Sequence, residues 1–468
     1  MTEPRARVDR GPLEWLLSPF ADLRRGEGVA VILLASNVFV LLLAYYLLKV
    51  TREALITPLD GGPRLKAAAA AGMALLLIPL LRLFDRLSER VGRMRLISVT
   101  TLAFGAALLA LGVTANVVHD SAPLAVGFFV FVGIFNMFII AQFWAFANDL
   151  YSESEGKRLF GVIAVGSSVG GIVGAQVAKR IFDASAEGRL MFAAAALLLV
   201  ALGLSWAANV RERQRRGAPP ELAAKTRIDQ SSSAPNDQRS NPPNTAEPGL
   251  ATGSGWAMLV RRRYFVLIAA MLVVYNCVNS VGEFILSSEV KRAALASGQP
   301  VAEYIASFIG DFFSVVNLVS LLLQMFVVSR VLKYAGVRAA LFVMPLVALG
   351  GYVAIGAVMS LLVIRIAKTA ENSLDYSLQN TTRQALWLVA TREEKYKVKA
   401  LVDTFFVRLG DVAAFGVITL GLDVLHLSTR GFAMTNVVLV VLWLAIAWGI
   451  TREHRRRSAL ALPTEKQG

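Results

Sequence analysis

Twelve long apolar segments constrain this chain more than any other feature. A helix needs about 20 mostly apolar residues to cross a bilayer, and the segments approach or exceed that length, although the tenth and eleventh are marginal because each carries several charges. Hydrophobic residues make up 56% of the chain and charged residues 17%, whereas soluble domains carry about 25% charged residues. The sequence therefore predicts an all-α polytopic membrane protein. The predicted spans are 29–56, 67–84, 96–118, 124–148, 159–182, 189–209, 264–287, 304–328, 337–359, 361–388, 400–421 and 431–450.

The distribution of basic residues predicts the orientation of the spans. The chain has 48 Lys and Arg against 33 Asp and Glu, a formal net charge of +15. The cations lie in short runs between apolar segments, such as Arg261-Arg262-Arg263, and not in a basic module that would bind nucleic acid. Cytoplasmic loops collect Lys and Arg, so we expect both termini in the cytoplasm. Richness in alanine and arginine, with no targeting segment before the first span, favours a bacterial inner membrane.

A polar segment divides the spans into two equal groups. Residues 210–258 are rich in Pro and Ser, with too little apolar surface to fold. We therefore expect an amphipathic cytoplasmic segment at 1–28, a six-helix half at 29–209, a disordered cytoplasmic linker at 210–258, a second six-helix half at 259–450 and a basic tail at 451–468.

The two halves share a basic turn. Arg86 precedes Gly92 after the second span, and Arg330 precedes Gly336 after the eighth, at the same spacing. The first turn resembles the Asp-Arg-x-Gly-Arg turn of the major facilitator superfamily, which has two six-helix halves related by an axis along the membrane normal. The resemblance implies a major-facilitator-like fold of twelve transmembrane helices.

Several spans carry ionisable side chains, which cost about 2.5–3.5 kcal/mol each at the middle of a bilayer. Such groups either pair with one another, as Lys49 could with Glu283, or line a polar path. The number of cations favours a path for an anion, because Arg donates two parallel hydrogen bonds to phosphate. The charged residues in or beside the spans are Lys49, Arg52, Glu53, Glu283, Asp311, Arg365, Lys368, Asp375, Arg383, Lys399, Asp403, Arg408 and Asp411.

Other motifs argue against an enzyme. Gly166, Gly170 and Gly174 lie at four-residue spacing in the fifth span, which is typical of close helix packing. The sequence has no nucleotide-binding glycine loop and no His-Glu-x-x-His motif. Cys277 is the single cysteine, so an intrachain disulfide and a multi-cysteine metal site are excluded. We expect no catalytic residues, no metal and no cofactor.

The charged segments resemble the nucleotide transporter family, the ATP/ADP translocases of plastids and obligate intracellular bacteria. The similarity runs from about residue 30 to residue 420, apart from the linker, and the run Phe143-Trp144-Ala145-Phe146-Ala147-Asn148 is its most specific part. The other matching segments are Tyr46–Glu53, Glu155–Arg158, Ser280–Glu283, Phe308–Phe312, Tyr376–Gln384 and Lys395–Asp403.

The resemblance implies transport of ATP and ADP, with Arg52, Glu283 and Lys399 at positions implicated in that family. The chain departs from the family in the fourth span, where the position of a family glutamate falls near Val132. It also has Asp375 in place of a family lysine and Gln384 in place of a glutamate. These departures leave the exact substrate open.

We therefore predict a secondary active transporter of nucleotides or related phosphate-bearing anions, a monomer in the bilayer that works by alternating access. A transporter of another organic anion or a drug is the main alternative, and a membrane sensor or scaffold without transport activity is a third. The candidate substrate-binding residues are Lys49, Arg52, Arg365, Lys368, Arg383 and Lys399. The candidate gating or coupling residues are Glu283, Asp311, Asp375, Asp403 and Arg408.

Overall fold

The computed structural model describes residues 27–118, 121–151, 153–183, 188–216, 255–391, 394, 398–399 and 401–461. Within these ranges the regular structure is helical throughout, which confirms the predicted all-α fold. The first half consists of α2 (Gly28–Ile56), α3 (Gly62–Arg90), α4 (Arg93–Val117), α5 (Ala122–Leu150), α6 (Glu153–Ile181) and α7 (Gly188–Arg216).

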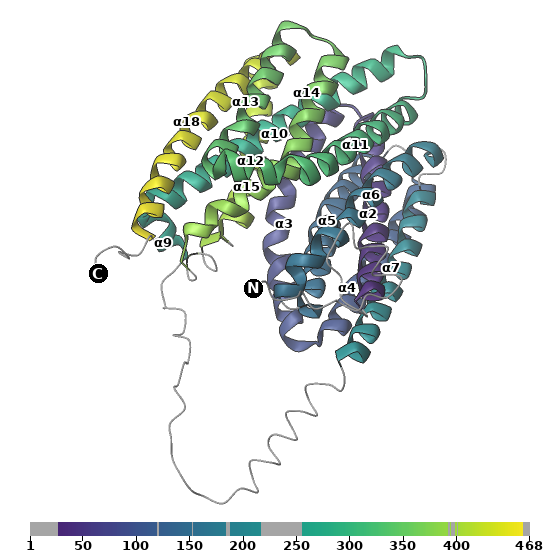
Figure 1. Cartoon of the computed structure of the whole chain (residues 1–468). Coiled ribbons are helices and arrows are strands. Elements are labelled where there is room, and N and C mark those ends of the chain that lie inside the picture. The colour runs from purple at the N-terminus through teal and green to yellow at the C-terminus, as the bar shows by residue number, and fades with distance from the viewer. Residues whose placement is uncertain are drawn as a thin grey trace, which may run out of the picture.

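The second half begins with the short helix α9 (Gly255–Arg261) and lies beside the first half (Figure 1). Its remaining elements include two π-helices, η1 and η3, and one 3-10 helix, η2. They are α10 (Arg263–Ala296), α11 (Val301–Phe326), α12 (Val328–Tyr334), α13 (Gly336–Ala357), α14 (Leu361–Leu374), η1 (Asp375–Gln379), α15 (Asn380–Ala385), η2 (Leu386–Val389), η3 (Val402–Phe406), α17 (Val407–Asp423) and α18 (Thr429–Ala461).

Eleven stretches of described helix are long and apolar enough to cross a membrane. Each corresponds to one of the predicted spans. The remaining predicted span, 361–388, is helical throughout but changes helix type, running through α14, η1, α15 and η2. A π-helix widens the helical turn and is often found at functional sites, and this one begins at Asp375, a predicted site residue. The twelve-helix prediction therefore holds, with a π-helix inside the tenth crossing.

Glycines allow α6 to pack directly against the backbone of α2. A Cβ atom at Gly166 would lie 2.4 Å from the Ala35 carbonyl oxygen, and one at Gly170 would lie 2.3 Å from that of Phe39. The predicted close packing of this glycine stripe is confirmed. It fixes α2, which carries Lys49 and Arg52, against the rest of its own half.

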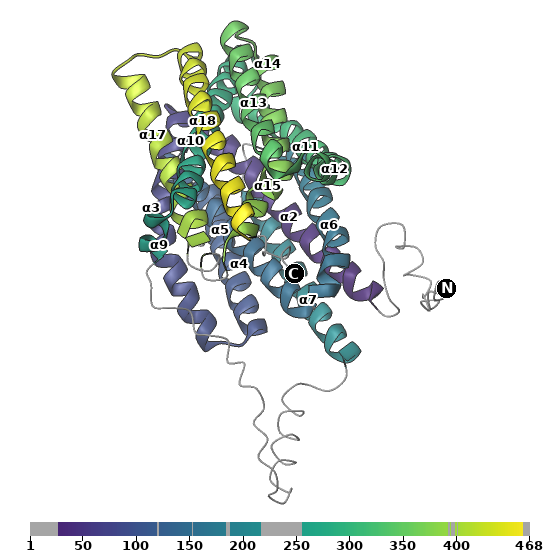
Figure 2. The ribbon, with the colours of Figure 1, turned by 60° about the vertical axis from the view of Figure 1, so that its left-hand side comes forward.

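The ends of the bundle can be named by the helices that meet there. At the α2–α3 end, α2 ends and α3 begins, while at the α7–α9 end α7 ends and α9 begins. Contacts between the halves gather at the α2–α3 end, where α17 lies beside α3 (Figure 2). Arg64 of α3 makes two hydrogen bonds of 2.8 and 2.6 Å to the Asp423 carboxylate of α17. Lys291 of α10 donates to the Leu59 carbonyl oxygen.

Three predicted domain boundaries differ from the helix ends. α7 continues to Arg216 and α9 begins at Gly255, so both helices extend into the segment predicted as linker. α18 continues to Ala461, well into the predicted tail, because Ala and Arg there sustain a helix. Most of the predicted N-terminal segment and the rest of the linker and tail lie outside the described residues.

Candidate functional site

A polar cavity of about 220 Å³ lies between the two halves. The first half contributes its wall from α2, α3 and α5, and the second half from α10, α11, α14 and η1. The polar and aromatic lining residues are Lys49, Arg52, Glu53, Lys66, Phe129, Asn279, Ser280, Glu283, Phe284, Phe313, Asn372, Asp375 and Tyr376.

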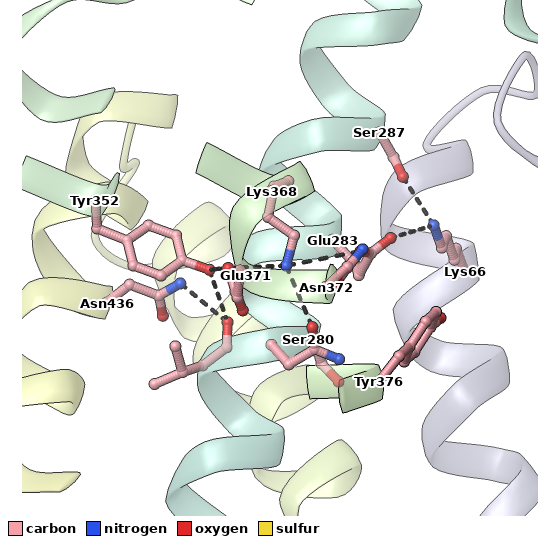
Figure 3. A network of polar contacts seen from close by, with 12 residues as sticks. Lys66, Ser280, Glu283, Ser287, Tyr352, Lys368, Glu371, Asn372, Tyr376 and Asn436 are labelled. Carbon is pink, nitrogen blue, oxygen red and sulfur yellow. Dashed lines mark hydrogen bonds and ion pairs between the residues drawn. The ribbon is translucent and has the colours of Figure 1, made fainter. Parts of the chain in front are cut away.

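Ion pairs run from α2 across the cavity to the second half. Glu53 accepts from Arg52 Nε at 3.3 Å and from Lys66 Nζ at 2.8 Å. Lys66 of α3 also lies 3.4 Å from a Glu283 oxygen and donates to Ser287 at 3.0 Å, so it joins α3 to α10 (Figure 3). Glu53 and Lys66 are almost fully buried, and their pairing offsets the cost of placing charges among apolar helices.

Glu283 connects this chain of charges to a buried cluster in the second half. Lys368 Nζ lies 3.6 Å from Glu283 and 3.1 Å from Glu371, and donates to Asn279 at 3.2 Å. Asn372 donates to the same Glu283 oxygen that Lys368 approaches, at 3.3 Å. Lys368 and Glu371 are buried, so neither has water to solvate its charge.

Tyr352 of α13 completes the cluster by donating to Glu371 at 2.9 Å (Figure 3). It reaches that position because residue 282 is glycine, where a Cβ atom would lie 2.0 Å from the Tyr352 hydroxyl oxygen. Asn436 of α18 donates to the Val278 carbonyl oxygen beside it at 3.0 Å. The cluster therefore ties α10, α13, α14 and α18 together.

Lys49 is surrounded by aromatic rings. Its Nζ lies 3.6 Å from the Phe313 ring centroid and 5.2 Å from that of Tyr46, distances at which a cation is attracted to the face of a ring. It donates to the Tyr376 hydroxyl at 3.2 Å. The Lys49–Glu283 pair considered from the sequence is wrong, because Glu283 pairs with Lys66 and Lys368 instead. Among the described residues, no carboxylate lies within ion-pair distance of Lys49.

Arg52 also lines the cavity. Its carbon centre lies 4.4 Å from the Phe129 ring centroid. Its Nε donates to Glu53, which is its one hydrogen bond among the described residues. Arginine has five N–H donors, so the guanidinium keeps donors for an anion in the cavity.

Asp375, a candidate gating residue, lines the cavity and accepts a hydrogen bond from Tyr275 of α10. Arg408 lies outside the cavity lining and pairs with Asp411 at 3.0 Å, and Asp411 also accepts from Asn276 and Ser280 of α10. These contacts hold η1 and α17 against α10.

The other predicted site residues lie away from the cavity lining. Asp311 of α11 pairs with Lys179 of α6 at 2.7 Å and thus joins the two halves. Arg365 lies over the Phe308 ring, with 5.3 Å between its carbon centre and the centroid. Arg383 donates to Asn380 at 3.4 Å, and Lys399 lies 3.8 Å from Asp403.

Sequence reasoning missed Lys66, Glu371 and Phe129. Lys66 immediately precedes the predicted span 67–84, so it was assigned to a loop although it is helical and buried. Glu371 lies three residues after Lys368, a spacing at which helical side chains meet, and this signal could have identified it. Val132, near the position of the missing family glutamate, is buried in the apolar core.

Two helical halves around a buried charged cavity define a secondary transporter. The family model of the Major Facilitator Superfamily matches residues 28–391. The chain therefore belongs to the Major Facilitator Superfamily, as its fold and its repeated basic turn predict.

Among curated proteins, the chain is similar to ADP,ATP carrier proteins of Chlamydia. It is 23% identical over 357 residues to ADP,ATP carrier protein 1 of Chlamydia trachomatis serovar D, which covers 68% of this chain and 63% of that protein. It is 22% identical over 358 residues to the protein of the same name from Chlamydia pneumoniae, covering 68% and 65%. The chain thus spans less than two thirds of the length of these relatives. The predicted resemblance to nucleotide transporters is confirmed as a distant similarity.

Solved structures share the fold. The nucleoside transporter NupG superposes with a TM-score of 0.60 at 8% identity and covers 90% of this chain and 98% of its own. A bacterial homologue of the human lysosomal transporter Spinster, in an inward-facing and unoccupied conformation, gives 0.59 at 11% identity, with coverage of 93% and 99%. At these identities the likeness concerns the fold.

Proposed function

We propose that this protein is a secondary active transporter of nucleotides or related phosphate-bearing anions. The observation that carries the proposal is the cavity between the halves, where Lys49 has no carboxylate partner among the described residues and Arg52 has N–H donors that no described residue accepts from. A polyanion entering the cavity would supply the acceptors for both groups. The similarity to the Chlamydia ADP,ATP carrier proteins supports a nucleotide as that anion.

In this proposal, Arg52 and Lys49 contact phosphate oxygens, and the neighbouring rings of Phe129 and Tyr376 contact the apolar part of the substrate. Lys66 joins them when Glu283 moves away. Of the other cations predicted to bind substrate, Lys368 belongs to the buried cluster behind Glu283. Arg383 and Lys399 would contact the substrate on its route between the cavity and the α7–α9 end, and Arg365 would contact it on its route between the cavity and the α2–α3 end.

The carboxylates take the gating roles. Glu283 holds Lys66 and Lys368 while the cavity is empty, and a phosphate competes with it for Lys66. Asp311 closes α11 against α6 through Lys179, and Asp375 fixes η1 against α10. Asp403 and Arg408 hold the start of the eleventh crossing, around η3 and α17. Each of these contacts would exchange partners as the halves rock about the cavity.

The described contacts favour a state closed at the α2–α3 end. The positive-inside bias places the termini, and with them the α7–α9 end, in the cytoplasm. The cavity would then face the cytoplasm in this state. We further propose that the protein works as a monomer in a bacterial inner membrane, by exchange or with a coupled proton.

The α5 wall favours keeping a second candidate, transport of another organic anion. Among the described residues, α5 contributes only Phe129 to the cavity lining, and Val132 of the same helix lies in the apolar core. Within the part of α5 that the structure describes, no carboxylate lines the cavity, so none from this helix would recognise the amino group of adenine there. A substrate without that group would fit the same cations.

Exchange of labelled ATP and ADP by proteoliposomes preloaded with unlabelled nucleotide tests the proposal. We expect saturable exchange that falls at least tenfold in Arg52→Ala, since a charge-assisted hydrogen bond is worth about 1.5–3 kcal/mol. Arg189→Ala is the matched control, because Arg189 pairs with Asp183 at the exposed surface. Folded, inserted protein that exchanges neither nucleotide would exclude adenine nucleotides and favour the second candidate, which a screen of organic anions would then test.

A further inference from the structure

Two adjoining hollows lie at the α7–α9 end of the first half, apart from the central cavity. The first is an apolar groove of about 440 Å³ between α3, α4 and α5, lined by residues that include Phe84, Ile97, Phe138 and Phe146. The second is a polar hollow of about 470 Å³ formed by the start of α4 and the ends of α5 and α7. Both include Arg93 and Asp149, so the groove opens into the hollow.

The polar hollow has an excess of positive charge. Its walls carry Arg93, Arg95 and Arg213, and among the described residues that line it Asp149 supplies the one carboxylate. Asp149 lies 3.5 Å from Arg93, which also donates to Asn209 of α7 at 2.9 Å, so Arg93 is held in place. Arg95 and Arg213 are exposed. The hollow thus offers two arginines to an external anion.

The start of α4 strengthens this preference for an anion. Its first turn contains no acidic residue, and Gly92 at the cap offers no side chain to its free N–H groups. Arginines are electrostatically disfavoured at this positive end of a helix. An anion in the hollow would satisfy both the arginines and the free N–H groups.

The two hollows lie at the positions along the membrane normal that the headgroup and acyl chain of a lipid occupy. The stretch of α3 that could cross the membrane ends at Phe84 and that of α4 begins at Arg93, so the arginines lie where the apolar spans give way to the polar interface. The groove extends from there along the spans. A molecule that fills both hollows needs an anionic head and an apolar chain.

We propose that this paired site binds one anionic phospholipid, with its phosphate among Arg93, Arg95 and Arg213 and one acyl chain in the groove. Met137, which lines the groove, contacts Arg408 of the second half at 3.8 Å. The bound chain therefore packs beside a surface where the halves meet.

Native mass spectrometry of the purified full-length chain, with phosphatidylglycerol or phosphatidylcholine added, tests the proposal. We expect one retained phosphatidylglycerol in preference to phosphatidylcholine. Arg95→Ala combined with Arg213→Ala should lower its retention about tenfold or more, because each basic residue contributes about 1 kcal/mol to binding an anionic lipid. Ala145→Trp, which fills the groove, should lower retention without changing the charge. Arg330→Ala combined with Lys333→Ala, in the matching turn of the second half, is the control and should have no effect.

Three results would overturn the proposal. They are equal retention by the Arg95/Arg213 variant and the control, equal retention of the two lipids, and full displacement of the lipid by inorganic phosphate, which would indicate a site for a free anion. Because Arg95 and Arg213 are exposed, their removal should leave the fold intact. An unchanged melting temperature in phosphatidylcholine alone checks this.

Discussion

At the scale of single residues, the two buried lysines Lys368 and Lys49 differ in whether a carboxylate pairs with them. Lys368 is fully buried, and Glu371 and Glu283 both lie within ion-pair distance of it. Lys49 instead contacts aromatic rings and a hydroxyl group. Loss of Lys368 would leave the buried Glu371 carboxylate without an ion-pair partner among the described residues, while Glu283 would keep Lys66. Loss of Lys49 would leave no carboxylate unpaired among those residues.

Lys368→Met should therefore destabilise the protein strongly, by about 3–5 kcal/mol, the cost typical of breaking a buried pair. Thermal unfolding in detergent measures the effect. Adding Glu371→Gln should recover much of the loss, because the second substitution removes the unpaired charge. If the double variant were as unstable as the single one, the Lys368–Glu371 pair would not be the source of the instability.

Lys49→Met should behave in the opposite way. We expect a melting temperature close to that of the wild type and substrate uptake reduced at least tenfold, because the substitution keeps an apolar chain among the rings and removes the unpaired cation. Lys66→Met is the comparison, since it removes one ion-pair partner from each of Glu53 and Glu283 and should lower the melting temperature as well. Unchanged uptake in folded Lys49→Met would remove Lys49 from the substrate site.

At the scale of helices, close helix packing and a π-helix within the tenth crossing determine where the charged side chains lie. The glycine face of α6 brings α2 close and fixes the direction in which Lys49 and Arg52 project. In the tenth crossing, the π-helix η1 changes the helical register after Asn372. Lys368, Asn372 and Asp375 face α10 at ordinary helical spacing, before the register changes, whereas Leu378 within η1 joins an apolar cluster with Val328 and Ala340.

Gly170→Leu should disrupt this packing. Its Cβ would meet the Phe39 backbone, which cannot yield as a flexible side chain does, so we expect a loss of at least about 1–3 kcal/mol, as for other overpacked sites. Gly161→Ala is the matched control on the same helix, because no atom lies within 4 Å of a Cβ there. Melting temperatures in detergent measure both, and equal values would show that α2 and α6 are not tightly held.

At the scale of the whole molecule, the two halves meet across a small number of polar contacts. The Arg64–Asp423 ion pair joins the two halves at the α2–α3 end, and the Lys66–Glu283 ion pair joins them deeper, at the cavity. The Arg64–Asp423 ion pair is partly exposed, with 39% and 47% of the two side chains accessible to solvent. Exposed pairs are worth about 1 kcal/mol or less, so this contact adjusts an equilibrium between states and does not lock it.

Asp423→Lys should shift the protein toward opening at the α2–α3 end, by up to about fivefold in population on that energy. Spin labels at Asp60→Cys and Val424→Cys, in a Cys277→Ser background, would report the separation of the halves. Arg64→Asp combined with Asp423→Arg should restore the original distance distribution. If Asp423→Lys left that distance distribution unchanged, the Arg64–Asp423 ion pair would have no part in closing the α2–α3 end.

The amino-acid sequence by itself determined the fold class and the position of the spans. Apolar length and helical periodicity are local properties, so they predict helices such as α2 and α10 whatever surrounds them. The placement of Lys49, Arg52, Glu283 and Asp375 in the cavity was also predictable, because ionisable groups in a span need a polar environment. The repeated turn at Gly92 and Gly336 identified the two halves in the same local way.

Only the tertiary structure decided which charges pair and which remain available. Lys66 and Glu371 gained their roles because α3, α10 and α14 converge, and the sequence does not state the distances between segments so far apart. Lys49 lost its expected carboxylate partner because Lys66 and Lys368 lie closer to Glu283. Pairing depends on side chains meeting within about 4 Å, and that meeting is set by the packing of helices and by the register change at η1.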